Sequence, residues 1–219
     1  MTPEEVIKQI TDLTSALIAH SYVDEQNFPS IRTHRDHLVE IGLSSGLDLS
    51  VSLKDIAYKD IYHALEHEGA FNFRLMDGGL VQMFYMFQNG VLISHRLAYF
   101  PSPMLEAYQN EPEIYEDDEI YADILAKNVV AFPIRFDFSS DEKLFTAIHH
   151  PKSHLTLGQY KNCRIPVSAP LTPVVFVQFI LRNLYSTAAR VAGDLGIRAT
   201  AFEPDIHESE QRIPHLRLA

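Results

Sequence analysis

Cysteine is nearly absent from the 219-residue chain, and long apolar segments are missing. The single cysteine cannot form a disulfide within the chain, which fits a reducing compartment. Neither a run of about 18 apolar residues nor a charged leader followed by an apolar stretch occurs, so we expect no membrane-spanning or secretory segment. These absences predict a cytoplasmic protein that does not contact a membrane.

Basic residues are scarce: 18 Lys and Arg stand against 29 Asp and Glu, which gives a net charge of -11. This balance excludes a protein whose whole surface binds nucleic acid, because that mode of binding needs many cations to neutralise phosphates. A local basic patch remains compatible with the sequence. Phosphate-binding glycine loops, a Ser nucleophile elbow and a nucleotide fingerprint are also missing, so the motifs name neither a reaction nor a cofactor.

The rest of the composition is that of a globular protein. Hydrophobic residues make up 46% of the chain and charged residues 21%, and no repeat, linker or low-complexity segment interrupts it. We expect a single α+β domain over residues 1–195. Residues 196–219 have little periodicity and are expected to form a C-terminal tail that is either docked or mobile.

Helical periodicity occurs in four segments, which cover residues 3–20, 52–67, 117–127 and 174–185. Three of them begin with a residue that can cap a helix, namely Thr2, Ser52 and Thr172. The side chains expected to be buried in the first two are Val6, Ile10, Leu13, Leu17, Ile56, Ile61 and Leu65. The last segment is apolar on nearly every side, which places it in the middle of the fold.

Elsewhere the period changes to two, and the segments are rich in aromatic and β-branched residues. The expected strands are AFNFRLM, GLVQMFYMFQ, VLISHRLAYF, VVAFPIRFDF and SHLTLGQY, with HLVEIGL as a further candidate. Asn89-Gly90 between two of them predicts a hairpin with a type I′ turn. The sequence therefore predicts an α+β fold: an antiparallel sheet of about five strands with helices packed mainly on one face.

Alternation within the last two strands separates apolar from polar side chains. We expect Val130, Phe132, Ile134, Phe136, Phe138, Leu155 and Leu157 on the apolar face, and Thr156 and Tyr160 on the other. If the strands form a hairpin through residues 139–152, then Arg135, Asp137 and His154 share the uncovered face. Pro151 would stiffen the turn that presents His150 and Lys152.

This group has a chemical meaning, because an aspartate that accepts from one imidazole nitrogen leaves the other free for proton transfer. Basic side chains could hold an anionic group such as phosphate. The candidate catalytic residues are His154 as general base, Asp137 as its orienting group, and His150; the candidate substrate-binding residues are Arg135, Lys152 and Arg164.

Simpler interpretations stand beside this one. Alternation always leaves polar residues on the solvent face of a sheet, where Arg and Asp often merely pair across strands. His150, His154 and Asp137 could also bind a metal, although no motif of specific spacing supports it. Three weaker candidates have structural explanations: His63 and His67 as a surface pair, the acidic run 111–119 as a solvated loop, and Cys163 as a small buried residue rather than a nucleophile.

Three long phrases resemble an uncharacterised bacterial family, the domain of unknown function 2290. They are FPSPMLEAYQNEPEIYEDDEIYADILAKNVVAFPIRFDF, HPKSHLTLGQYKNCRIPVSAPLTP and FVQFILRNLY, and the resemblance covers roughly residues 70 to 190. The family carries no assigned activity. Its RFD strand followed by HPxSHL is similar to small proteins of phage-defence or toxin–antitoxin loci, some of which act on nucleic acid.

Two functions of different classes follow. The first is an enzyme of such a system, whose polar sheet face binds a phosphate-containing nucleic acid and cleaves it by His/Asp acid–base chemistry. The second is a non-catalytic accessory or neutralising protein, whose acidic charge and YFPSPMLEAY segment engage a larger, more basic protein. An uncovered sheet face or edge would in addition favour a homodimer.

Overall fold

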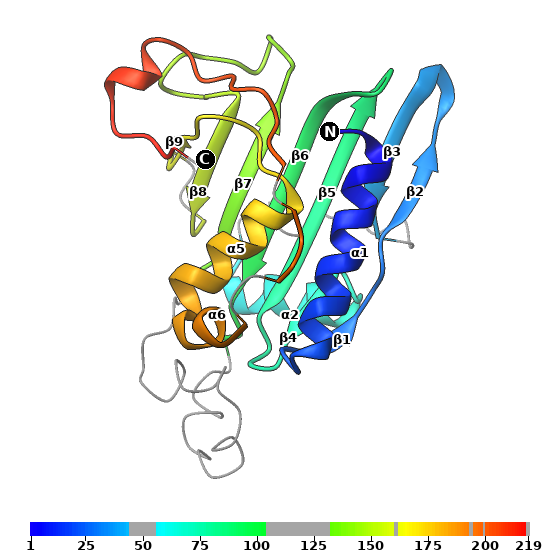
Figure 1. Cartoon of the computed structure of the whole chain (residues 1–219). Coiled ribbons are helices and arrows are strands. Elements are labelled where there is room, and N and C mark those ends of the chain that lie inside the picture. Colours follow the sequence, from blue (N-terminus) through cyan, green and yellow to red (C-terminus); the bar gives the residue numbers. More distant parts are fainter. Residues whose placement is uncertain (44–55, 104–131, 160–161, 193–194, 199, 218–219) are drawn as a thin grey trace.

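The computed structural model describes residues 1–43, 56–103, 132–159, 162–192, 195–198 and 200–217. These residues form one antiparallel sheet with helices on both faces (Figure 1). The strands are β1 Val23–Gln26, β2 Ser30–Thr33, β3 Leu38–Gly42, β4 Phe73–Leu75, β5 Leu80–Gln88, β6 Val91–Phe100, β7 Ile134–Ser139, β8 Ser153–Leu157 and β9 Ile165–Pro166. The predicted α+β class is confirmed, and with nine strands the sheet is larger than the predicted five.

The strand order places β5, β6, β7 and β8 side by side. The sheet runs β1-β4-β5-β6-β7-β8-β9, and β3, which itself pairs with β2, joins β5 beyond the end of β4. Every pair of named strands is antiparallel. The sheet is therefore a meander at its centre, with β5 and β6 as its longest pair.

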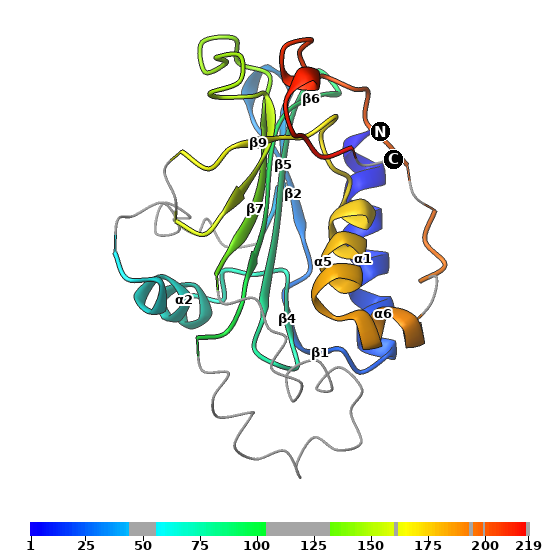
Figure 2. The ribbon, with the colours of Figure 1, turned by 90° about the vertical axis from the view of Figure 1, so that its left-hand side faces the viewer.

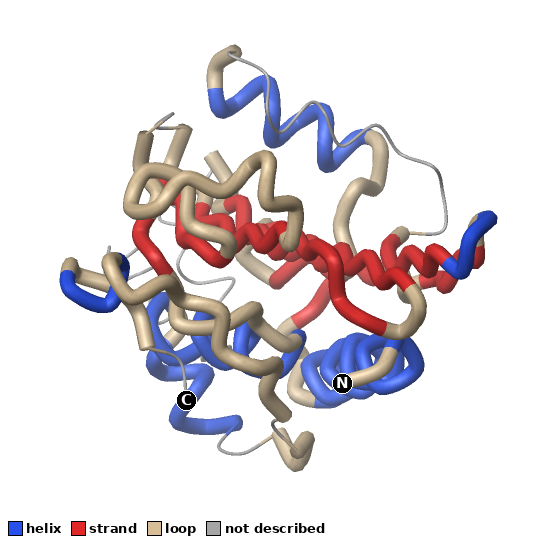
Figure 3. The backbone as a smooth tube through the Cα atoms, turned by 90° about the horizontal axis from the view of Figure 1, so that it is seen from above, coloured by secondary structure: helices blue, strands red, loops and turns tan. Residues whose placement is uncertain are grey.

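Most helices lie on one face of the sheet, as predicted. The helical elements are α1 Pro3–Ala19, η1 Arg35–His37, α2 Tyr58–His67, α5 Pro173–Leu184, α6 Ser186–Ala192 and η4 Glu210–Arg212. Figure 2 shows α1, α5 and α6 on one side of the sheet and α2 on the other, and the view from above in Figure 3 shows the same layers. The sequence predicted that the face opposite α1 and α5 is uncovered. In the structure α2 covers part of it (Figure 2).

Helix α1 follows directly from its sequence. The Thr2 hydroxyl accepts a hydrogen bond from the Glu5 backbone N–H, and the Glu5 carboxylate accepts one from the Thr2 N–H, which makes a capping box. The four side chains predicted to be buried, Val6, Ile10, Leu13 and Leu17, are fully buried in the main core. Burial of each contributes roughly 1.5–3 kcal/mol, so the apolar stripe fixes the helix on the sheet.

The hairpin between β5 and β6 has the predicted turn. Asn89 and Gly90 both have positive φ, at 51° and 78°, as a type I′ turn requires. Helix α5 also begins as predicted, because the Thr172 hydroxyl accepts from the Val175 N–H and Pro173 occupies the first turn. These local signals set a hairpin that contributes to the cleft described below and a helix that covers the other face of the sheet (Figure 2).

Several bounds and burial states differ from the sequence-based prediction. Helix α2 begins at Tyr58, so Ile56 lies before it and is 41% exposed. Strand β7 begins only after Pro133, which cannot donate to a strand ladder, and Phe132 is 42% exposed instead of buried. Cys163 is partly exposed. The other expectations for Ser52, Val130, Tyr160, the acidic run and the helix over 117–127 fall outside the described residues.

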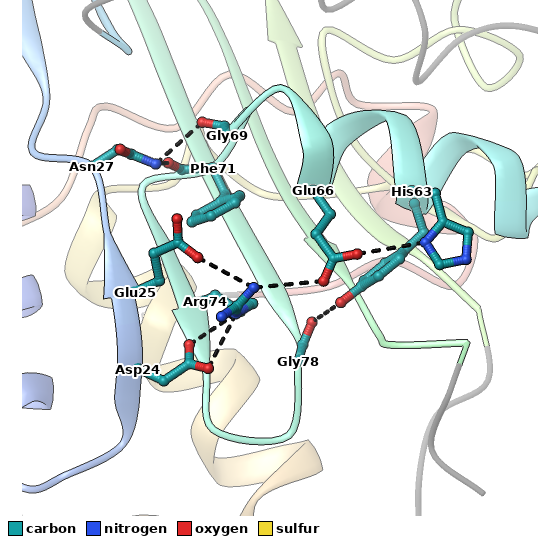
Figure 4. A network of polar contacts seen from close by, with 10 residues as sticks. Asp24, Glu25, Asn27, His63, Glu66, Gly69, Phe71, Arg74 and Gly78 are labelled. Atoms are coloured by element: carbon teal, nitrogen blue, oxygen red, sulfur yellow. Dashed lines mark hydrogen bonds and ion pairs between the residues drawn. The ribbon is translucent and has the colours of Figure 1, made fainter. Parts of the chain in front are cut away.

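An ion-pair cluster ties the edge of the sheet to α2 (Figure 4). The Arg74 guanidinium from β4 contacts Asp24 at 2.9 Å, Glu25 at 3.2 Å and Glu66 at 3.6 Å. Glu66 also lies 3.5 Å from His63, so this histidine belongs to a surface cluster, as expected. No described helix is long and apolar enough to cross a bilayer.

The buried His95 gives the fold a testable pH dependence. Its Nε2 accepts a hydrogen bond from the Leu171 N–H at 3.0 Å, and a protonated Nε2 could not accept it. Burial lowers the pKa of His95 from 6.5 to about 4. Between these two pH values the unfolded chain binds this proton and the folded chain does not. Stability therefore falls as the pH is lowered from 6.5 towards 4.

We expect His95 to contribute a loss of about 2–3 kcal/mol between pH 7 and pH 4.5, which follows from the size of the pKa change. The measurement is urea unfolding of the wild type and of His95→Gln at both pH values. The variant should lose less stability on acidification than the wild type. Equal losses in the two proteins would contradict the assignment.

Candidate functional site

A row of side chains crosses four neighbouring strands on the α2 side of the sheet. The register pairs Phe84 of β5 with Arg96 of β6, Arg96 with Asp137 of β7, and Asp137 with His154 of β8. Paired residues of adjacent strands project to the same face. The hairpin that the sequence predicted between β7 and β8 therefore does place Asp137 and His154 side by side.

These residues line a cleft with a volume of about 790 Å³. All six candidate residues line it: His154, Asp137, His150, Arg135, Lys152 and Arg164. Five Arg or Lys side chains and two carboxylates form part of its wall, whereas the whole chain has a net charge of -11. The cleft is thus a local basic region in an acidic protein, which is the arrangement that attracts an anion.

Asp137 lies between two arginines. Its Oδ1 accepts from Arg96 Nε at 3.2 Å, and its Oδ2 accepts from Arg135 Nε at 2.5 Å. Burial alone would raise the pKa of Asp137, but the two guanidinium groups outweigh it and hold that pKa below its usual value. Asp137 is therefore a carboxylate at neutral pH, and it fixes both arginines in the floor of the cleft.

His154 is held by a backbone carbonyl and not by Asp137. Its Nδ1 donates to the Pro151 carbonyl at 2.9 Å, and its Nε2 lies 3.9 Å from Asp137 Oδ2, which is too long for a hydrogen bond. The expected hydrogen bond to Asp137 is thus replaced by one to Pro151. Because Nδ1 carries the proton in the neutral ring, Nε2 carries the lone pair.

Burial also sets the charge of His154, whose residue is 6% exposed. It lowers the pKa of His154 below 6.5, and the nearby Asp137 carboxylate opposes this only in part. The imidazole is consequently neutral at physiological pH. A neutral ring with one free nitrogen beside a cluster of cations has the state that a general base requires.

The segment between β7 and β8 brings a second histidine to the first. A backbone bridge joins Thr146 to His150, and the His150 and His154 ring centroids are 5.2 Å apart. The His150 Nδ1 donates to the Leu144 carbonyl, which leaves its Nε2 for another partner. Lys152, from the same segment, pairs with Glu142 at the surface.

Arg164 reaches the cleft from the segment before β9, whose Pro166 pairs with His154 in the strand register. Among the described residues, no carboxylate forms an ion pair with Arg164. A guanidinium without a described counter-ion can bind an incoming anion without the loss of an internal ion pair. Arg164 is therefore the most available cation of the cleft.

The described part of the C-terminal tail packs against the strand that carries His154. The Ser153 hydroxyl donates to Asp205 Oδ2 at 3.1 Å, and Leu216 forms a parallel bridge with Val167. Burial raises the pKa of Asp205 to about 6. The Glu210 carboxylate accepts from the Ile148 N–H at 3.3 Å, so the tail also holds the segment that carries His150.

Sequence reasoning missed three parts of this site. Arg96 and Phe84 lie in strands that were predicted correctly, and extending the alternation argument to the two strands before Asp137 would have found them. Arg32, paired with Glu40 at 3.4 Å, lies in β2, which was not predicted because it has only four residues. Among the residues that the structure describes, no three His, Cys, Asp or Glu side chains are grouped to hold a metal ion.

The family model of an uncharacterised conserved protein, DUF2290, matches residues 22–218. The chain belongs to this family. The resemblance seen in the sequence is thereby confirmed, and the match spans every strand of the DUF2290 sheet and all six candidate residues. Neither a protein of curated function nor a solved structure matches the chain. The roles of the six residues in this DUF2290 protein stay predictions.

The two arginine pairs of Asp137 generate a prediction about stability. In Asp137→Asn the two guanidinium groups lose their counter-ion in a largely buried position, so we expect the free energy of unfolding to fall by about 2 kcal/mol. Urea unfolding at pH 7 measures it, with Glu203→Gln as an exposed control that should be unchanged. A variant as stable as the wild type would show that this carboxylate does not hold the cleft together.

Proposed function

We propose that the cleft binds a phosphate-containing nucleic acid and that His154 cleaves one of its phosphodiester bonds as a general base. The observation that carries the proposal is the excess of cations in the cleft of an otherwise acidic protein, beside a buried neutral imidazole. Phosphate groups are the anions that arginine clusters bind best, through paired N–H donors.

Binding would use three cations of different availability. Arg135 is fixed by Asp137 and presents its remaining donors to the cleft, whereas Lys152 must exchange its surface partner Glu142 for the substrate. Arg164 has no described counter-ion to give up. We expect Arg164 to contribute most to the capture of phosphate and Arg135 to its orientation.

The chemistry would proceed without a covalent enzyme intermediate. A hydroxyl group attacks the phosphorus, its proton passes to Nε2 of His154, and the bond from phosphorus to the leaving oxygen breaks. The His150 imidazolium donates a proton from its Nε2 to this leaving oxygen. The Asp137 carboxylate, 3.9 Å from Nε2, stabilises the imidazolium that His154 becomes, and Arg135 stabilises the charge on the phosphoryl oxygens.

Such an activity would suit a phage-defence or toxin–antitoxin system, the setting that the sequence resemblance suggested. The other candidate, a non-catalytic partner of a larger effector, predicts no cleavage of any substrate. Half of its YFPSPMLEAY segment falls outside the described residues, and no specific observation favours it over the cleft.

The decisive experiment incubates the purified protein with labelled single- and double-stranded RNA and DNA, with and without magnesium. We expect cleavage of at least one substrate, and a loss of at least 100-fold in His154→Ala because its general base is removed. His63→Ala, an exposed histidine on α2, is the matched control and should cleave normally. Absence of cleavage with every substrate would overturn the enzymatic proposal.

The pH dependence of the rate tests the assigned base independently. Because the pKa of His154 lies below 6.5, the rate should be independent of this group above pH 6.5 and should fall as the pH drops through that pKa, where Nε2 becomes protonated. The measurement is the initial rate between pH 4.5 and 7.5, with folding checked by circular dichroism at each pH. A rate that shows no fall at the acid end of this range would contradict the role of His154.

A further inference from the structure

The cleft has an apolar half that the proposed chemistry does not use. It lies over β3 and β5, where Leu43, Phe84 and Met86 line the wall. The strand register pairs Met86 with Glu40 on one side and with Ser94 on the other, so polar groups border this apolar floor. The cleft therefore offers a charged end and an apolar, polar-rimmed end within one volume.

Phe84 is the aromatic element of this half, and its position is fixed. A Cβ on Gly42 would lie 2.5 Å from the Phe84 ring, so the ring occupies the space that this glycine leaves open. Phe84 also packs against the second core cluster, which joins α2 to the sheet, and it remains only partly buried. A ring held in this way loses little conformational freedom when a ligand stacks on it.

We propose that this apolar half binds one unpaired base of a single-stranded RNA whose phosphodiester group lies at His154. The inference rests on the proposed function and names its substrate class. Phe84 is two strand spacings, roughly 10 Å, from Asp137, and Arg96 lies between them. A nucleotide next to the scissile phosphate thus meets an aromatic ring for its base and a guanidinium group near its own phosphate.

The occupant is a base and not a simple apolar ligand, because the floor is both aromatic and bordered by hydrogen-bonding groups. Every base has a π-face that stacks on an aromatic side chain, and its edge needs polar partners such as Glu40 and Ser94. In a duplex the base is already paired and stacked, so only an unpaired base can enter. A volume of about 790 Å³ has the size of pockets that enclose one small organic ligand.

The paired imidazoles favour RNA over DNA. In RNA the attacking hydroxyl is the neighbouring 2′-hydroxyl: the 2′-oxygen forms a bond to phosphorus, and the bond from phosphorus to the 5′-oxygen breaks. The 2′-hydroxyl proton passes to His154 Nε2, and His150 donates a proton to the departing 5′-oxygen. The products are a 2′,3′-cyclic phosphate and a 5′-hydroxyl, and the protons are exchanged with water afterwards.

Binding is measured separately from cleavage, with the full-length His154→Ala protein and fluorescently labelled oligonucleotides. The probes are a short single-stranded RNA, its duplex, and the same strand with abasic positions. We expect the single strand to bind more tightly than the duplex and the abasic strand. An added Phe84→Leu substitution should weaken single-strand binding about tenfold, because it removes the stacking surface and keeps an apolar side chain.

Phe28→Leu is the matched control, because Phe28 is 44% exposed and does not line the cleft. Its affinity for the single strand should be unchanged. Competition with a 5′-mononucleotide and with inorganic phosphate separates the two sources of binding: the mononucleotide should compete better if the base has its own site. The abasic probe gives the same answer with the Phe84 side chain intact, so the test does not depend on the folding of Phe84→Leu.

The results distinguish the two proposals. Equal binding of abasic and intact strands, or of duplex and single strand, overturns the base site even if the RNA is cleaved. Base-dependent binding without any cleavage by the wild-type protein supports the base site and overturns the catalytic role of His154. Detection of a 2′,3′-cyclic phosphate by mass spectrometry supports the catalytic role of His154 on RNA, and a product that carries a 5′-phosphate excludes the 2′-hydroxyl as the nucleophile.

Discussion

The register of the four antiparallel strands β5 to β8 is the constraint on which both faces of the molecule depend. A slip of one residue in any of these pairs would exchange the two faces of a strand. In the observed register, Phe136 of β7 points towards the helices and meets Phe176 and Phe179 at 6.0 and 5.1 Å between ring centroids. The same register brings Asp137 and His154 together on the opposite face. One set of backbone pairings thus positions the core and the cleft.

Burial has different consequences for the ionisable groups on the two faces. His95, on the helix side, accepts a backbone hydrogen bond and is kept neutral as part of the core. His154 is also kept neutral by burial, yet its Nε2 makes no hydrogen bond to a described residue and belongs to the wall of a cleft. Asp137 stays charged in spite of burial because two guanidinium groups face it. The cleft therefore combines a neutral imidazole with fixed charges, which is the combination on which our proposals are built.

Local signals predicted the elements in which neighbours along the chain decide the structure. The cap of α1, the type I′ turn at Asn89-Gly90 and the Thr172 cap of α5 each need only a few adjacent residues, and all three occur as predicted. Strands β1, β2 and β9 have four, four and two residues, so alternation within them cannot be recognised, and they exist because a neighbouring strand offers them hydrogen bonds. The start of α2 was misplaced for a related reason, since an apolar period can extend beyond the first hydrogen-bonded turn of a helix.

The sequence by itself determined the class of fold, the hairpin of β7 and β8, and the presence of Arg135, Asp137 and His154 on one face, because the alternation of a strand is a local property. Only the tertiary structure decided that the Pro151 carbonyl orients His154, that Arg96 joins Asp137, and that Phe84 extends the cleft. Arg96 and Phe84 come from strands about 40 and 50 residues before Asp137 in the chain, as the strand register shows. Pro151 is only three residues before His154, but its hydrogen bond, like that of Arg96, depends on distances of tenths of an ångström that no pattern of residue types specifies.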